Sequence, residues 1–327
     1  MTPEAGHRHG TVAVGYDGSE AAQQAVRWAA EYAATVHSSL RVVHAFVWPV
    51  FTKNLGPVKG VEGSGLRHAA ETILAEGVQL ARRAYRPLPD VAPGASTGVN
   101  TAVSIDGGGM DGVDVDRPDV DSTNAGGPAD DSADVDGVME AGLPAQVLRS
   151  AARDARLLVI GSRGIGGVLG QLAGSVCLDL AGSSPCPMIV IRRPRSPGKP
   201  VVTGIDGTSR SSAALAGGVH LATRLRTHLQ LVYIDQSHGS DHDDHGRHAP
   251  LQGQEVLDRA LAEARLLAPD LDVAGTLLHG RAASKELLAA SVDADVLVIG
   301  THNREGGPGN TVSAVLHKAR CNVLITR

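Results

Sequence analysis

The sequence predicts an α/β protein of two tandem, doubly wound domains, each built on a five-stranded parallel sheet. Three observations lead to this fold class. The chain has 327 residues, which is long for one α/β domain and sufficient for two. Short apolar runs alternate with longer helical patterns, as a parallel sheet covered by helices on both faces requires. Four segments of the first half also recur, in the same order, in the second half.

The repeated segments read as strands together with the residues that follow or precede them. The pairs are VAVGYDGSE (12–20) with VVTGIDGTSR (201–210), LRVVHAF (40–46) with LQLVYID (229–235), DARLLVIGSRG (154–164) with DADVLVIGTHN (293–303), and CPMIVIRR (186–193) with CNVLITR (321–327). We therefore expect a duplication, with one domain over 1–193 and a second over 200–327. The basic, Pro-rich stretch RRPRSPGKP (192–200) continues neither helix nor strand and is the expected linker.

The first half illustrates the alternation of elements. We expect strands near 11–16, 40–47, 134–139, 157–160 and 187–192, and helices near 20–36, 66–86, 144–154 and 174–183. Ser19 and Ser209 each follow an Asp-Gly pair at the end of a first strand and are expected to cap the next helix. Aromatic residues are only 2% of the chain, so the core must be built from Ala, Val, Leu and Ile, with Trp28 packed inside.

Composition excludes several classes of protein. A formal net charge of −5 gives no basic footprint for nucleic acid. The sequence has no apolar run long enough for a membrane span and begins with a polar stretch unlike a signal peptide. Three widely separated cysteines favour a reducing compartment. We expect a soluble, cytoplasmic protein in which Cys186 and Cys321, at equivalent places in the repeat, are packing residues.

The first half carries an acidic insert over about 90–136. Asp17 lies 144 positions before Gly161, whereas Asp206 lies only 94 before Gly300. The extra residues are rich in Gly, Asp, Ser and Pro, which cannot bury enough apolar area to offset the entropy of ordering. We expect a disordered loop. The clustered carboxylates also suit calcium, but the spacing of known calcium loops is missing, so this is the weaker alternative.

Glycines are concentrated after the fourth expected strand, in GSRGIGGVLGQLAGS (161–175). Gly161, Gly164 and Gly174 have the spacing G-x2-G-x9-G, and Ser175 follows. Glycines let backbone N–H groups approach phosphate closely, although they also serve tight turns. With the first-strand GYDGSE and the second-strand VVHAF, this spacing resembles the ATP-binding branch of the universal stress protein family. The resemblance covers both halves, so the chain is identified as a tandem member.

The resemblance implies a fold, a ligand and a site. It implies the adenine nucleotide alpha hydrolase-like fold, with strand order 3-2-1-4-5 in each half and antiparallel pairing of the two last strands. ATP, with Mg²⁺, would be the ligand of the first half. Its nucleotide-binding residues would be Asp17, Ala45, Gly161, Arg163, Gly164, Gly174 and Ser175. Asp17 would contact the ribose or adenine, the backbone at Ala45 the adenine, and the glycine loop with Arg163 and Ser175 the phosphates.

The second half has a degenerate copy of this loop. Asn303 replaces Gly164, Asn310-Thr311 replaces Gly174-Ser175, the loop is three residues shorter, and Pro308 removes an N–H donor. Asp206 persists. We expect this half to bind nucleotide weakly or not at all.

Histidines are concentrated in SHGSDHDDHGRHAP (237–250). His238, His242, His245 and His248 lie among aspartates, which zinc or nickel could use. Gly239, Gly246 and Pro250 favour a solvated loop instead, and no metal site is predicted. His44 and His68 lie in or near apolar faces and are expected to be packed residues.

The resemblance implies an ATP-binding regulatory protein of the stress response. Nucleotide would control conformation or the binding of an unidentified protein partner, and the chain would form a homodimer. No catalytic residue is predicted, because the site offers no general base poised on a nucleophile. Two alternatives remain open, a slow ATP-hydrolysing enzyme and a scaffold that binds no nucleotide.

Overall fold

The computed structural model describes residues 10–46, 64–86, 134–164, 173–208, 211–236, 249–301 and 307–327. Elements alternate strand and helix in both halves, as the sequence predicts. The first half contains β1 (Thr11–Gly15), α1 (Glu20–Thr35), β2 (Ser39–Phe46), α2 (Ser64–Ala84), β3 (Val135–Ala141), α3 (Pro144–Ala151), β4 (Ala155–Gly161), α4 (Ser175–Ser183) and β5 (Met188–Ile191). The second half contains β6 (Val201–Ile205), α5 (Ser211–Leu225), β7 (Leu229–Asp235), α6 (Ala249–Leu267), β8 (Val273–His279), α7 (Ala283–Ala290), β9 (Val296–Gly300), α8 (Asn310–Lys318) and β10 (Asn322–Thr326).

The strands form one ten-stranded sheet in the order β3-β2-β1-β4-β5-β10-β9-β6-β7-β8. Pairing is parallel within each half. At the junction β5 pairs antiparallel with β10, and Val190 lies opposite Val323. The antiparallel pairing expected for the last strands is therefore confirmed, and it makes one continuous sheet of the two tandem halves.

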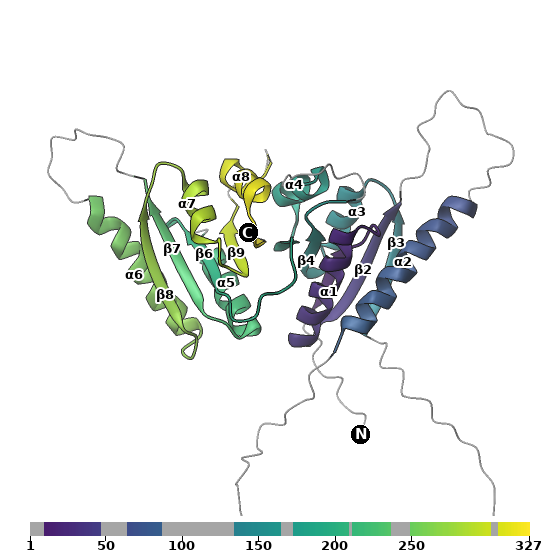
Figure 1. Ribbon diagram of the computed structural model, residues 1–327, viewed down its shortest axis with the longest axis horizontal. Helices are drawn as coiled ribbons and strands as arrows, with labels where there is room; N and C mark the ends of the chain where they lie inside the picture. The colour runs from purple at the N-terminus through teal and green to yellow at the C-terminus, as the bar shows by residue number, and fades with distance from the viewer. Residues whose placement is uncertain are drawn as a thin grey trace, which may run out of the picture.

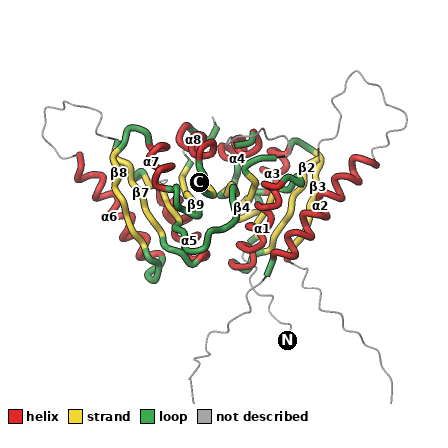
Figure 2. Tube along the Cα trace, in the orientation of Figure 1, coloured by secondary structure: helices red, strands yellow, loops and turns green. Residues whose placement is uncertain are grey.

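Helices cover both faces of this sheet (Figures 1 and 2). One buried cluster lies between the sheet and α1, α2, α5 and α6. A second lies between the opposite face and α3, α4, α7 and α8. Each cluster contains residues of both halves, so the halves share their cores as well as a strand pair. In Figure 1, α4 and α8 lie side by side above the junction, while α2 and α6 form the outer flanks.

Small side chains build the interior, as the low aromatic content predicts. Ala25, Ala29 and Ala33 recur along one side of α1 and are fully buried, which lets the helix approach the sheet closely. Trp28 is buried on the same helix, where it stacks on Tyr32 with ring centroids 5.1 Å apart. Its predicted place in the core is confirmed.

The beginning of α1 follows from local sequence. The Ser19 hydroxyl accepts a hydrogen bond from the Ala22 amide at 3.2 Å, so Ser19 is the N-cap. Ser209, its predicted counterpart, lies outside the described residues. The same holds for most of the acidic insert, whose end at Val135 already belongs to β3.

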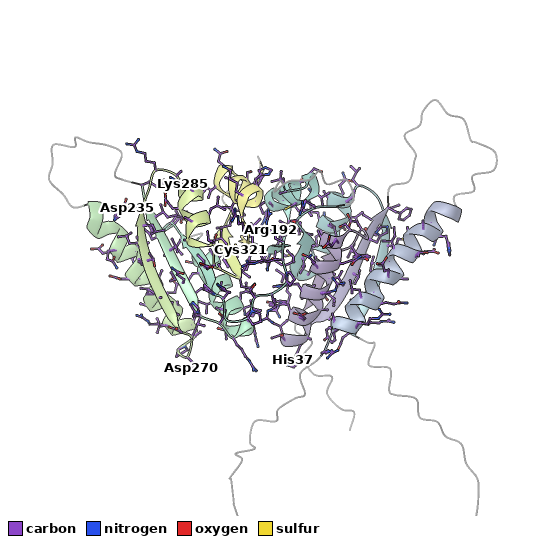
Figure 3. All side chains as sticks on the ribbon, in the orientation of Figure 1. His37, Arg192, Asp235, Asp270, Lys285 and Cys321 are labelled. Atoms are coloured by element: carbon purple, nitrogen blue, oxygen red, sulfur yellow. The ribbon has the colours of Figure 1, made fainter. Side chains whose placement is uncertain are left out.

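Arginines at the end of β5 fasten the two halves together. The amides of Arg192 and Arg193 donate to the side-chain oxygen of Asn322, at 2.9 and 3.3 Å. Their guanidinium groups donate to the carbonyl groups of Leu316 and Ala294. Asn322 is fully buried. Figure 3 labels Arg192 and, beside it at the middle of the molecule, Cys321.

Replacing Asn322 with Ala removes the acceptor of two partly buried backbone amides. Leaving a buried donor unsatisfied costs about 1–3 kcal/mol. We expect Asn322→Ala to lower the free energy of unfolding by an amount in this range, measured by urea denaturation. Gln254→Ala, which removes an exposed hydrogen bond to Asp258, should change it by less than about 0.5 kcal/mol. Equal effects of the two changes would contradict the role given to Asn322.

Candidate functional site

A cavity of about 470 Å³ opens where β1, β2 and β4 end, next to α3 and the beginning of α4. Parallel strands bring their carboxyl ends to one edge, and ligands of doubly wound sheets bind there. All the site residues predicted from the sequence line this cavity. They are Asp17, Ala45, Gly161, Arg163, Gly164, Gly174 and Ser175.

The turn after β1 holds Asp17 in a fixed position. Its carboxylate accepts a hydrogen bond from the Ser19 amide at 3.0 Å. The Ser19 hydroxyl donates to the carbonyl oxygen of Arg163 at 3.4 Å, which ties this turn to the glycine loop. Buried His44 donates from Nδ1 to the carbonyl oxygen of Tyr16 at 2.8 Å. The end of β1 is thus held from both β2 and the loop.

The two ends of the glycine loop are closed by backbone hydrogen bonds. The Ser162 amide donates to Ile191 at 3.0 Å, and the Gly174 amide donates back to the carbonyl oxygen of Ser162 at 3.1 Å. Gly174 is the N-cap of α4, which begins at Ser175 as expected. The middle of the loop, 165–172, lies outside the described residues.

Gly161, Gly164 and Gly174 each lie beside a different neighbour. A Cβ on Gly161 would lie 2.7 Å from the backbone of Ala21, so this glycine allows β4 to pack against α1. A Cβ on Gly164 would lie 2.6 Å from the carboxylate of Asp17. A Cβ on Gly174 would meet nothing closer than 3.8 Å. Gly161 therefore allows close packing, whereas Gly164 allows the loop to approach Asp17, a residue predicted to contact the ligand.

Apolar residues form much of the remaining lining of the cavity, and nothing in the sequence marked them as ligand contacts. Val43, Pro144, Leu148 and Ile160 line it from β2, α3 and β4. Leu148 belongs to the apolar side of α3, a signal that indicates a core position as readily as a cavity wall. Its assignment required the knowledge that α3 lies over the ends of β1 and β4.

Two ionisable side chains of the wall are kept neutral. Burial, and after it the neighbouring Glu76, raises the pKa of Tyr16 to about 12. Burial also raises the pKa of the Cys177 thiol to about 12, which removes its nucleophilic thiolate at neutral pH. The other ionisable residues among the described lining residues are Asp17 and the exposed Arg163.

The lining of the cavity therefore combines polar and apolar groups. Arg163 and the first turn of α4 supply a cation and backbone amides that have no acceptor within the helix. Val43, Leu148 and Ile160 offer apolar surface. The arrangement suits a molecule with an anionic group and a flat apolar group.

The equivalent place in the second half is built differently. The Asp206 carboxylate accepts hydrogen bonds from the Thr208 amide and hydroxyl, at 3.0 and 2.7 Å, and from the Ser211 hydroxyl. Before α8, Gly309 has φ of +79°, whereas Gly174 before α4 has φ of −66°. Asn303 lies outside the described residues.

The loop before α8 also packs against the first half. A Cβ on Gly182 of α4 would lie 2.8 Å from Gly307 and 3.1 Å from Pro308. In return, His317 of α8 accepts a hydrogen bond from the Ala173 amide at 3.4 Å. Gly182 and His317 are each the eighth residue of their helix. The second-half loop thus contributes to the junction between the halves.

The remaining expectations have mixed outcomes. Buried His44, Cys186 and Cys321 are packing residues, as predicted. His68 is exposed on α2, so its predicted place in the packing was wrong. The helix is amphipathic, and His68 follows Arg67 on its outer side.

His238, His242, His245 and His248 lie outside the described residues. Within the described ranges no cluster of His, Cys, Asp or Glu has the geometry of a metal site. None of the helices in those ranges is long and apolar enough to cross a bilayer.

The different neighbours of the glycines predict different costs of substitution. Gly161→Ala places its Cβ against the backbone of Ala21, which cannot move aside cheaply, so we expect a loss of about 1–3 kcal/mol. Gly65→Ala, whose Cβ has no neighbour within 4 Å, should leave stability unchanged or raise it. Thermal and urea unfolding measure both changes. An unchanged stability of Gly161→Ala would contradict the close approach of β4 and α1.

Comparison with known proteins gives one consistent result. The sequence model of the universal stress protein family matches residues 9–192 and 198–327. A universal stress protein of Mycobacterium tuberculosis is 27% identical over 331 residues, covering 97% of this chain and 94% of that protein. A second from the same organism is 27% identical over 335 residues, covering 98% and 97%. The crystal structure of a universal stress protein from Archaeoglobus fulgidus superposes with a TM-score of 0.65 at 14% identity, covering 97% of this chain and 98% of that one. The chain belongs to the universal stress protein family, with two copies of the family's domain in tandem.

Proposed function

We propose that the cavity of the first half binds an adenine nucleotide, ATP with Mg²⁺. The observation that carries this proposal is the contact between Gly164 and Asp17. A Cβ at 164 would lie 2.6 Å from the Asp17 carboxylate and would force it to move, so a glycine here lets the loop and the end of β1 approach each other closely. The N-terminus of α4 opens onto the same cavity.

Each part of the nucleotide has a matching part of the cavity. The phosphates lie at the loop, near Arg163, the α4 amides and the Ser175 hydroxyl. Asp17 accepts hydrogen bonds from the ribose hydroxyl groups. The adenine lies against the backbone at Ala45 and the apolar wall. A volume of about 470 Å³ is within the range of about 300–1,000 Å³ typical of small-molecule sites.

The second half is proposed to bind nucleotide weakly or not at all. The side chain of Asp206 is engaged by Thr208 and Ser211. Gly307 and Pro308 contact α4, so the loop before α8 serves the junction.

The function that follows is regulation in the stress response. Nucleotide occupancy of the domain over 1–193 controls conformation or the binding of a protein partner, and the domain over 200–327 transmits or supports the change. The fold is of the adenine nucleotide alpha hydrolase-like type. We place the protein in the cytoplasm as a homodimer without nucleic acid or membrane as partner.

An enzymatic role is the second candidate. Bound ATP with a metal ion can hydrolyse slowly, but the neutral Tyr16 and Cys177 provide no base or nucleophile near the proposed phosphates. Turnover well above the slow loss of bound nucleotide would favour an ATPase. A scaffold without ligand is the third candidate.

Substitutions at Gly164 test the site directly. Gly164→Ala pushes its Cβ into the Asp17 carboxylate, and we expect at least a tenfold rise in the Kd for ATP, measured by isothermal titration calorimetry with Mg²⁺. Gly164→Glu combined with Gly174→Glu should abolish binding. The control Gly65→Ala should bind as the wild type does. Wild-type affinity in Gly164→Ala would contradict the proposed site.

Matched aspartate changes test the asymmetry of the halves. Asp17→Asn replaces the carboxylate that is proposed to accept hydrogen bonds from the ribose hydroxyl groups. We expect the affinity for ATP to fall about tenfold, which corresponds to the loss of one charged hydrogen bond. Asp206→Asn and Asn303→Gly should each change it less than twofold. Equal losses from Asp17→Asn and Asp206→Asn would show that both halves bind.

A further inference from the structure

A second crevice, of about 280 Å³, lies on the opposite face of the sheet, at the junction of the halves. The first half contributes Trp28 and Tyr32 of α1, Arg156 of β4 and Ile189 of β5. The second half contributes residues of α5 and β10, among them Ala213, His220 and Leu324. The crevice shares no lining residue with the proposed nucleotide site.

The lining of the crevice includes positively charged side chains. A guanidinium nitrogen of Arg156 lies 3.4 Å from Nε2 of His220. Burial lowers the pKa of His220, and the charged groups that act on it, Arg156 and Arg224, lower it further because both are positive. Arg156 is thus held at the edge of an apolar crevice, where a charge-assisted hydrogen bond to an anion is strengthened by the low dielectric constant.

The crevice also has an aromatic part, which carries an unsatisfied donor. Trp28 and Tyr32 stack with an interplanar angle of 14°. The indole N–H of Trp28 is buried and has no hydrogen-bond partner among the described residues. A buried indole N–H usually finds an acceptor, and leaving it without one costs about 1–3 kcal/mol. Leu157, Ile189, Leu221 and Leu324 add apolar lining, and Thr326 and Arg327 add a hydroxyl group and a second cation.

We propose that this crevice binds a small organic carboxylate with a flat apolar body. The carboxylate pairs with Arg156 beside His220, and the apolar body lies against the side chains of α1 and α5. A volume near the lower limit for small-molecule sites, about 300 Å³, selects a ligand smaller than a nucleotide. Because the crevice is lined from both halves, such a ligand stabilises their junction.

Three probes separate what the negative charge and the flat apolar part of the ligand each contribute to binding. They are 2-naphthoate, its uncharged analogue 2-naphthamide, and inorganic phosphate, which has charge without an apolar body. Binding is followed through the indole N–H resonance of Trp28 in the ¹⁵N-labelled full chain. Trp48→Phe removes the second tryptophan and so assigns the signal. We expect saturable shifts with 2-naphthoate, and at least tenfold weaker binding of 2-naphthamide and phosphate.

Variants then locate the site. Arg156→Gln should weaken 2-naphthoate at least tenfold, and Ala213→Leu, which fills the crevice without changing its charge, should do the same. Arg163→Gln, in the proposed nucleotide cavity, is the matched control and should leave 2-naphthoate binding unchanged. Unfolding temperatures identify any variant that fails to fold, and the other variant then decides.

The proposal is overturned if 2-naphthoate causes no saturable shift of the Trp28 resonance in the wild type. It is also overturned if 2-naphthamide or phosphate binds as tightly as 2-naphthoate, or if Ala213→Leu binds like the wild type. If ATP displaced 2-naphthoate, the probe would be bound in the nucleotide cavity, and this result would likewise overturn the proposal.

Discussion

Strands β1 and β4 are neighbours in the sheet, but the chain leaves them toward opposite faces. Helix α1 follows β1 onto one face, and α4 begins on the other after the glycine loop. The segments that follow these two strands therefore diverge, and a cavity forms between the strand ends, with α3 as one of its walls. Asp17 and the glycine loop reach the cavity because each directly follows one of these strands.

Close packing accounts for two glycines of this loop. Gly161 lies against the backbone of α1, and Gly164 lies against the Asp17 carboxylate. The second half retains Gly300 but has Asn303 in place of the second glycine. Its loop instead places Gly307 and Pro308 against Gly182. Two copies of one domain have thus diverged, one loop facing a cavity and the other a helix.

The contacts at the junction connect the loop of the second half to the proposed nucleotide cavity of the first half. Helix α4 is held by the second half through Gly182 and through the hydrogen bond from Ala173 to His317. Since α4 also opens the proposed nucleotide cavity, a change in the loop there has a direct route to the second half. The shared cores on both faces of the sheet make the two halves one structural unit.

Much of this architecture was predictable from the sequence, for identifiable reasons. The strands are short apolar runs, the Ser19 cap has its own local signal, and the repeat indicated two similar halves. Residues that depend on contacts between distant segments were harder to predict. Leu148 lines the cavity only because α3 crosses the ends of β1 and β4, and exposed His68 could not be separated from the apolar positions of α2. The crevice beside Trp28 exists only because β5 pairs with β10.

The central claim is that one half of the chain, and only one, binds an adenine nucleotide. Native mass spectrometry of the full chain incubated with ATP and Mg²⁺, together with identification of what denaturation releases, tests it most directly. We predict a single adenine nucleotide per chain. Two nucleotides per chain, or none, would contradict this account.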